Sequence, residues 1–206
     1  MEEENVKSLY RDMTALPHQP AMSVEEYFHL DQSNAEARYE YIDGYVRMLA
    51  EGTLDHATIS ANVHRCLYQA LRGGSCRVYT SDARVRLSKS RYVYPDVTVT
   101  CDERDRGKQS TIYYPSLVVE VLSPGTRDYD RGGKFTYYRT CPTIQEYVLV
   151  DTEYQTVEVF RRQREDLWLL QMFRSDSIVD LVSLNVSFPV ASVYEDTIIP
   201  AYDAEV

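Results

Sequence analysis

Apolar residues recur at four-residue steps in one long segment of the chain, at Ile59, Val63, Leu67 and Leu71. This spacing puts them on one side of a helix, so we predict a core-facing helix over about residues 55–71, ended by Gly73-Gly74. A shorter helix is predicted from Ser23 to about Asp31, because Ser23 and Glu26 form a capping box.

Most of the remaining chain alternates apolar and polar residues with the period of a β-strand. The clearest pair, Tyr39–Ile42 and Tyr45–Met48, flanks Asp43-Gly44 and predicts a type I′ hairpin, since both central residues of that turn need positive φ. Two more helices are predicted, over residues 129–139 and 190–194. Further strands are predicted over residues 77–80, 83–87, 94–99, 117–122, 146–151, 156–161, 168–173 and 186–188.

This order of elements is typical of a mixed α/β or α+β domain, with helices packed against a curved β-sheet. A chain of 206 residues can bury a sizeable core within one large domain. Residues 1–20 are polar and show no clear periodicity. We therefore predict a flexible N-terminal tail over residues 1–20 and a single domain over residues 21–206.

Two carboxylates stand inside strands that are otherwise β-branched or aliphatic. Asp96 follows Pro95 at the start of one strand, and Glu120 lies in the middle of Val118-Val119-Glu120-Val121-Leu122. A buried carboxylate costs several kcal/mol unless a cation pairs with it or a metal is coordinated. Mg²⁺ prefers one or two carboxylates with water in the remaining positions, so this pair suggests a divalent metal site.

Each candidate also has a structural explanation. Asp96 taken alone fits a strand-entry residue hydrogen-bonded to a neighbouring turn. Lys134 could stabilise charge on a phosphate, but taken alone it is better explained by an exposed ion pair with Asp130. Glu40 is either an outer-sphere or second-metal carboxylate or an exposed hairpin residue. Glycosidases also use two carboxylates, although nothing places the 18 tyrosines around this pair as a sugar platform.

Composition limits the partners and the compartment. The net charge of −10 repels polyanions at long range, so nucleic-acid binding would need a local basic patch. No apolar run approaches the roughly 18 to 20 residues of a membrane span, and the acidic start differs from a signal peptide, so a cytoplasmic location is expected. The four cysteines form no Cys-x-x-Cys pair and are predicted to be reduced, mostly buried thiols.

A series of motifs in this order resembles the Uma-type restriction endonuclease family of the PD-(D/E)XK nuclease superfamily. The resemblance spans roughly residues 22–195. The motifs are Tyr39-Glu40-Tyr41-Ile42-Asp43-Gly44, the helix with His56, Ser81-Asp82-Ala83-Arg84-Val85, Tyr94-Pro95-Asp96-Val97, Val119-Glu120-Val121-Leu122-Ser123-Pro124, the segment Tyr129 to Tyr138, and Gln145-Glu146-Tyr147-Val148-Leu149-Val150-Asp151.

The resemblance implies a restriction-endonuclease-like core and a metal-dependent DNA endonuclease with Mg²⁺ or Mn²⁺. Asp96 and Glu120 would be metal ligands, helped by the backbone carbonyl of Val121, and Glu40 would be the helper acid. The superfamily has lysine two residues after the glutamate, where this chain has Leu122. Lys134 on the next helix is the predicted replacement, and contacts to the DNA backbone are expected from Arg84, Arg86, Lys89 and Arg91.

A second interpretation is a catalytically silent nuclease-fold module that binds a protein or nucleic acid. Leu122, the net charge of −10 and the many tyrosines motivate it. Cutting both strands of a duplex needs two sites or two visits, which makes a homodimer compatible with the nuclease interpretation.

Overall fold

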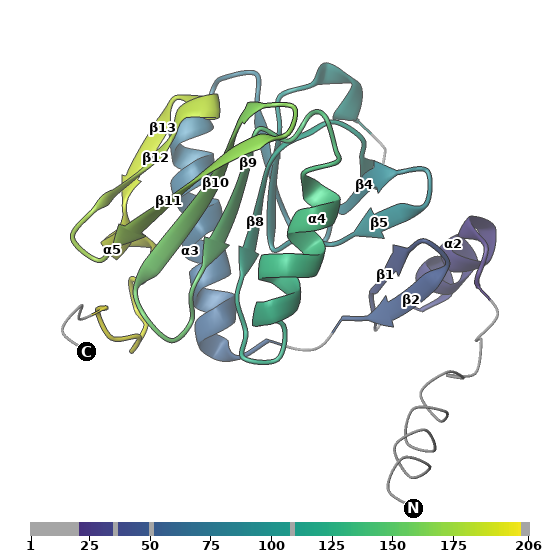
Figure 1. Ribbon diagram of the computed structural model, residues 1–206, viewed down its shortest axis with the longest axis horizontal. Helices are drawn as coiled ribbons and strands as arrows, with labels where there is room; N and C mark the ends of the chain where they lie inside the picture. Colours follow the sequence, from purple (N-terminus) through teal and green to yellow (C-terminus); the bar gives the residue numbers. More distant parts are fainter. Residues whose placement is uncertain (1–20, 35–36, 50–51, 108–109, 203–206) are drawn as a thin grey trace, which may run out of the picture.

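The computed structural model describes residues 21–34, 37–49, 52–107 and 110–202 (Figure 1). The predicted tail over residues 1–20 lies outside the described residues. The largest sheet has six strands in the order β11-β10-β9-β8-β6-β3. Their bounds are β3 (Arg77–Thr80), β6 (Val97–Thr100), β8 (Pro115–Val121), β9 (Glu146–Val150), β10 (Thr156–Arg164) and β11 (Leu167–Arg174).

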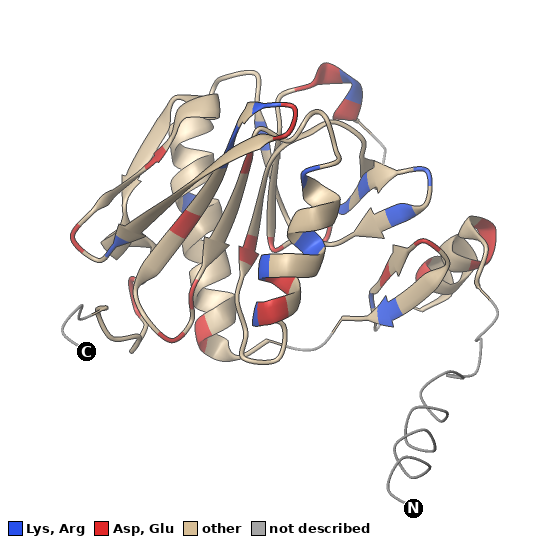
Figure 2. Cartoon of the chain, viewed as in Figure 1, with Lys and Arg blue, Asp and Glu red and all other residues tan. Residues whose placement is uncertain are grey.

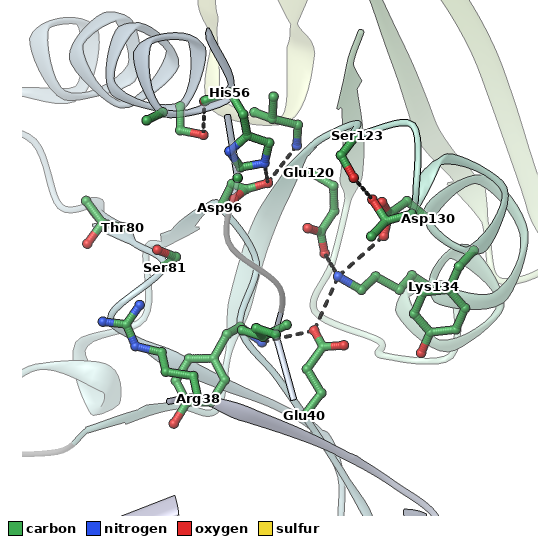
Figure 3. Close-up of a pocket in the computed structure, with 18 of the residues that line it drawn as sticks. Arg38, Glu40, His56, Thr80, Ser81, Asp96, Glu120, Ser123, Asp130 and Lys134 are labelled. Atoms are coloured by element: carbon green, nitrogen blue, oxygen red, sulfur yellow. Dashed lines mark hydrogen bonds and ion pairs between the residues drawn. The ribbon is translucent and has the colours of Figure 1, made fainter. Parts of the chain in front are cut away.

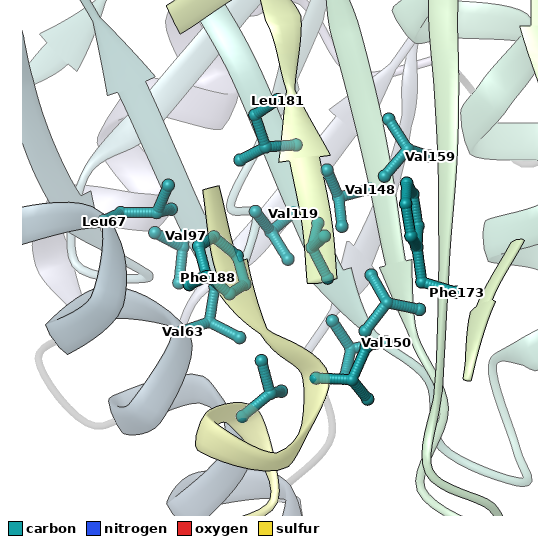
Figure 4. Packing of buried hydrophobic residues seen from close by; sticks show 14 of the residues in the cluster. Val63, Leu67, Val97, Val119, Val148, Val150, Val159, Phe173, Leu181 and Phe188 are labelled. Atoms are coloured by element: carbon teal, nitrogen blue, oxygen red, sulfur yellow. The ribbon is translucent and has the colours of Figure 1, made fainter. Parts of the chain in front are cut away.

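One helix covers one face of this sheet. α3 (Leu54–Leu71) is capped by the side chain of Thr53, and its residues Ile59, Val63 and Leu67 are buried, as their spacing predicts. They pack against the valines of β6, β8, β9 and β10 and against Phe188 (Figure 4). The same core includes residues of β12 (Ile178–Leu181), the 3₁₀ turn η3 (Val182–Leu184), β13 (Val186–Pro189) and α5 (Val190–Val193).

The opposite face carries the crossover between β8 and β9. These two strands run parallel, so the connection from the end of β8 to the start of β9 must run back over one face of the sheet. It consists of the π-helix η2 (Tyr129–Lys134) and α4 (Phe135–Tyr138). A Cβ on Gly133 would lie 2.7 Å from Cδ2 of Tyr129, so any other residue there would force the Tyr129 ring to move. Tyr138 is fully buried here, next to Tyr147 of β9.

A second sheet has the order β2-β1-β5-β4-β7. The predicted hairpin is present, with φ of 50° at Asp43 and 98° at Gly44. The predicted capping box is also present at the start of α2, and Tyr27 of that helix packs against Tyr41 and Tyr92. The bounds are α2 (Val24–Ser33), β1 (Tyr39–Ile42), β2 (Tyr45–Met48), β4 (Arg84–Ser88), β5 (Arg91–Val93) and β7 (Thr111–Ile112).

The cysteine prediction is wrong for two of the four residues. Cys76 and Cys101 form a disulfide, whereas Cys66 and Cys141 are free. The cause is the pairing of β3 with β6, in which Arg77 lies opposite Thr100 and the next positions outward are the two cysteines. Strands β5, β7 and β12 and the 3₁₀ turn η1 (Glu103–Asp105) were not predicted.

The predicted fold class is confirmed: the protein is an α+β structure with mixed sheets flanked by helices (Figure 1). Within the described part of the chain, no helix has the length and apolar character needed to span a membrane.

Candidate active site

The predicted pair of carboxylates comes together at one end of the six-stranded sheet (Figure 3). β6 and β8 are antiparallel neighbours with Val97 opposite Val119, so the next position of the register places Asp96 beside Glu120. The backbone N–H of Val121 donates a hydrogen bond of 2.7 Å to Asp96 Oδ2. The expectation that the two acidic residues occupy neighbouring strands is confirmed.

Lys134 extends from η2 into the same cluster and is only 6% exposed. Its Nζ lies 2.9 Å from Glu120 Oε1, 3.2 Å from Glu40 Oε1 and 3.4 Å from Asp130 Oδ1. The ion pair with Asp130 is therefore real, but it is buried and is one of three. Lys134 also contacts Glu120 directly, as its predicted replacement of a lysine at position 122 requires.

Glu40 is brought to the cluster by the β1–β2 hairpin. It is 1% exposed, which rules out the interpretation as an exposed hairpin residue. Besides Lys134, its Oε1 accepts a long hydrogen bond of 3.4 Å from the backbone N–H of Tyr94. The second sheet thus contributes one acidic side chain to a site built mainly on the first.

Three residues of this site were not assigned a role from the sequence. Asp130 is buried beside Lys134, and the hydroxyl of Tyr138 donates a 2.5 Å hydrogen bond to Glu120 Oε1. Both stand four residues from Lys134, so the helical spacing was a usable signal. His56, near the start of α3, places its Nε2 3.5 Å from Asp96 Oδ2.

The cluster carries more negative than positive charge. The pKa of Glu120 is raised to about 8, mainly by burial; Lys134 opposes the rise, and the nearby Asp96, Asp130 and Glu40 add to it. Burial alone would lower the pKa of Lys134, but Glu120, Glu40 and Asp130 outweigh it and raise that pKa well above its ordinary value. Three buried carboxylates thus contact one ammonium group, and the fourth carboxylate, Asp96, lies beside Glu120.

The acidic cluster lines a cavity of about 950 Å³. Its lining includes Asp96, Glu120, Asp130 and Lys134 together with two arginines, Arg38 and Arg47. The guanidinium group of Arg47 lies over the ring of Tyr129 at 4.7 Å. The cavity therefore places cationic side chains near a buried acidic centre.

Comparison with known proteins identifies the family. Residues 24–191 match the model of Uma2, described as "Putative restriction endonuclease". The chain belongs to the Uma2 family. The resemblance inferred from the motifs is confirmed, and the family is one of proteins described as nucleases.

Two Synechocystis sp. relatives support this assignment. The uncharacterized protein slr1290 is 36% identical over 176 residues, which cover 85% of this chain and 92% of that protein. The uncharacterized protein sll1609 is 31% identical over 152 residues, which cover 72% of this chain and 85% of that protein. Neither name adds an activity to the Uma2 description.

A solved structure shows the same fold. The protein is described as a putative nuclease belonging to DUF820 from Anabaena variabilis, and it superposes with a TM-score of 0.69 at 19% identity. The match covers 84% of this chain and 97% of the other. This chain therefore shares its fold with that solved structure.

The donor atoms of this Uma2 site suit a hard divalent cation. Among the described residues, no group of three or more His, Cys, Asp or Glu side chains is arranged to hold a metal ion. The expected site needs only two carboxylates and the carbonyl of Val121, and the cavity is lined by Asp96, Glu120 and Val121. Burial is the main cause of the raised pKa of Glu120, and a divalent cation would neutralise the negative charge of Asp96, Asp130 and Glu40 that adds to it.

The predicted DNA contacts of the Uma2 chain need one correction. Basic residues gather on β4, β5 and the turn between them (Figure 2), but Arg84 is 6% exposed and pairs with Asp31 at 2.6 Å. A buried guanidinium with this partner is not available to DNA, so the prediction is wrong for Arg84. Arg86, Lys89 and Arg91 are more accessible but do not line the cavity, whereas Arg38 and Arg47 do.

Proposed function

We propose that this protein is a divalent-metal-dependent endonuclease that hydrolyses phosphodiester bonds of DNA. The observation that carries the proposal is the 2.9 Å contact between Lys134 Nζ and Glu120 Oε1, in a cluster that also contains Asp96 and Glu40. The lysine that the nuclease superfamily carries two residues after its glutamate is replaced here by one from the next helix.

In this proposal Asp96, Glu120 and the carbonyl oxygen of Val121 would hold Mg²⁺ or Mn²⁺. When bound, the ion supplies a water of lowered pKa and neutralises charge on the phosphate. The hydroxyl of Tyr138 and the ammonium of Lys134 both donate to Glu120 Oε1 and fix the orientation of that carboxylate. Its other oxygen is then free to face the cavity.

Lys134 and Glu40 have separate roles. The Lys134 ammonium lies at the wall of the cavity, where it would stabilise the negative charge that develops on a phosphate oxygen during attack. Glu40 would be an additional acidic residue of the site and would hold Lys134 in place through the 3.2 Å contact between Glu40 Oε1 and Lys134 Nζ. Arg38 and Arg47 would contact the DNA backbone on either side of the bond to be cut.

The proposal predicts metal-dependent cleavage of supercoiled plasmid DNA. Wild-type protein with Mg²⁺ or Mn²⁺ should produce nicked and linear forms, and a chelator should prevent this. Asp96→Ala should lower the rate by roughly a thousandfold or more, because the site loses one of its two carboxylate ligands. Agarose-gel time courses over a range of metal concentrations would measure both rates.

A matched control is Asp176→Ala, which removes an exposed aspartate between β11 and β12. It should cleave at the wild-type rate. Wild-type inactivity with every metal and with both duplex and single-stranded DNA would refute the enzyme proposal. Equal activity of the wild-type and Asp96→Ala proteins would show that cleavage arises elsewhere.

A further inference from the structure

Strand β11 forms one edge of the six-stranded sheet (Figure 1). In the described chain it pairs with β10 on one side only, so its outer backbone groups have no partner strand. The strand is also unusually apolar, because residues 167–173 contain no charge and no proline. Its exposed fractions are 49% for Leu167, 50% for Leu169, 50% for Leu170 and 47% for Met172.

Edge strands of soluble proteins normally carry features that prevent pairing with another chain. Lysine in the middle of the strand, proline, a bulge or a covering loop serve this purpose. In β11 the only charged residue is Arg174 at its end, and the bulge between Arg162 and Arg164 lies in β10 beside the turn. A long apolar edge without these features is suited to pairing.

We propose that β11 pairs antiparallel with β11 of a second copy of this chain, with Leu170 on the two-fold axis. In one continuous antiparallel sheet, two residues that lie directly opposite each other point to the same face. Residues of β11 on the same face are two positions apart, so the paired positions are related by an axis that passes through a residue and not between two residues. Leu169, Leu170 and Gln171, at the centre of the strand, are the three choices.

The charges at the two ends of the strand select Leu170. With Leu170 opposite itself, Arg174 of each copy lies opposite Asp166 of the other, in the turn before β11. With Leu169 on the axis, Arg174 would instead meet Arg164 of the second copy. With Gln171 on the axis, Arg174 would meet Trp168, and Asp166 would lie opposite Asp176. Leu170 alone gives opposite charges at both ends.

The same register also pairs the apolar side chains. On the face that carries Trp168, the indole ring would lie opposite Met172 of the second copy, on each side of the central Leu170 pair. Trp168 is already fixed there by the guanidinium group of Arg162 at 4.4 Å and by contact with Phe135. Exposed apolar area that has no partner in the monomer would thus be buried between copies.

The test is the oligomeric state of the full chain by sedimentation velocity over the micromolar range at physiological salt. The wild type should be a dimer. Leu170→Lys, which puts two ammonium groups together on the axis, should give monomers. Ile198→Lys is the matched control, because it makes the same change at a 90% exposed aliphatic residue outside the strand and should remain dimeric.

A charge exchange tests the register. Asp166→Arg or Arg174→Asp alone places like charges together twice per dimer, and each should weaken the dimer by about tenfold or more. The double variant Asp166→Arg/Arg174→Asp should recover it. A monomeric wild type, a dimer unaffected by Leu170→Lys, or a double variant as weak as the single ones would overturn the proposal. None of these outcomes depends on nuclease activity.

Discussion

Replacing Lys134 with methionine is expected to lower the free energy of unfolding by about 3 to 5 kcal/mol and to abolish DNA cleavage. Methionine fills a similar volume, so the effect comes from charge. Without the ammonium group, Glu120, Glu40 and Asp130 face one another in a buried cluster with no cation. Cleavage is lost because a phosphate in the cavity loses the same positive group.

Urea denaturation and the plasmid assay measure the two effects. Lys89→Met is the matched control, since Lys89 is exposed on the β4–β5 turn and its loss should change stability by less than about 0.5 kcal/mol. If Lys134→Met unfolds at the wild-type urea concentration, the buried contacts of Lys134 do not hold the cluster together. Full cleavage activity in a folded Lys134→Met protein would show that Lys134 is not needed for catalysis.

Glu120→Gln is expected to change stability in the opposite direction. Burial raises the pKa of Glu120 to about 8 from its ordinary value of 4.5, so between these pH values the folded state keeps a proton that the unfolded state has lost. This contribution to stability is fully present below about pH 4.5 and is lost as the pH rises to about 8. Glutamine removes the ionisation, so metal-free Glu120→Gln should gain about 1 to 3 kcal/mol at pH 8, while cleavage is lost.

Glu158→Gln is the contrasting control. Glu158 is also a buried strand glutamate that pairs with a cation, Arg131, at 2.5 Å. Lys134 keeps Glu40 and Asp130 when Glu120 is neutralised, whereas Arg131 keeps Asp151 at the longer distance of 3.6 Å, so Glu158→Gln should destabilise the protein. Thermal unfolding of both variants in chelator, followed across pH 5 to 8, measures the difference. A loss of stability for Glu120→Gln equal to that of Glu158→Gln would mean that Glu120 is not under electrostatic strain.

Local signals in the sequence were sufficient for most of the fold. The capping box at Ser23 and the Asp43-Gly44 turn depend on backbone geometry within a few residues, and both are present. The four-residue spacing from Ile59 to Leu67 identifies the buried face of a helix without information from other segments, and these residues are buried in α3. The placement of Asp96 and Glu120 was also predictable, because a carboxylate in an aliphatic strand needs a partner.

Features that depend on pairings between distant segments could not be predicted. Arg84 alternates with apolar residues like an exposed strand residue, but Asp31, which pairs with it, lies 53 positions away. The disulfide between Cys76 and Cys101 follows from the register of β3 with β6, which neither strand encodes alone. Asp130 and Tyr138 stand four residues from Lys134, but this spacing identifies them as site residues only if Lys134 is known to point inward.

Isothermal titration calorimetry with Mn²⁺ tests most directly whether Asp96 and Glu120 form a metal centre. The wild-type protein should show a metal site, with Mg²⁺ competing for it. Asp96→Asn and Glu120→Gln should each abolish that binding while remaining folded, and Asp176→Ala should retain it. A folded wild-type protein that binds neither ion, or binding that persists unchanged in both variants, would contradict the assignment and favour a catalytically silent module.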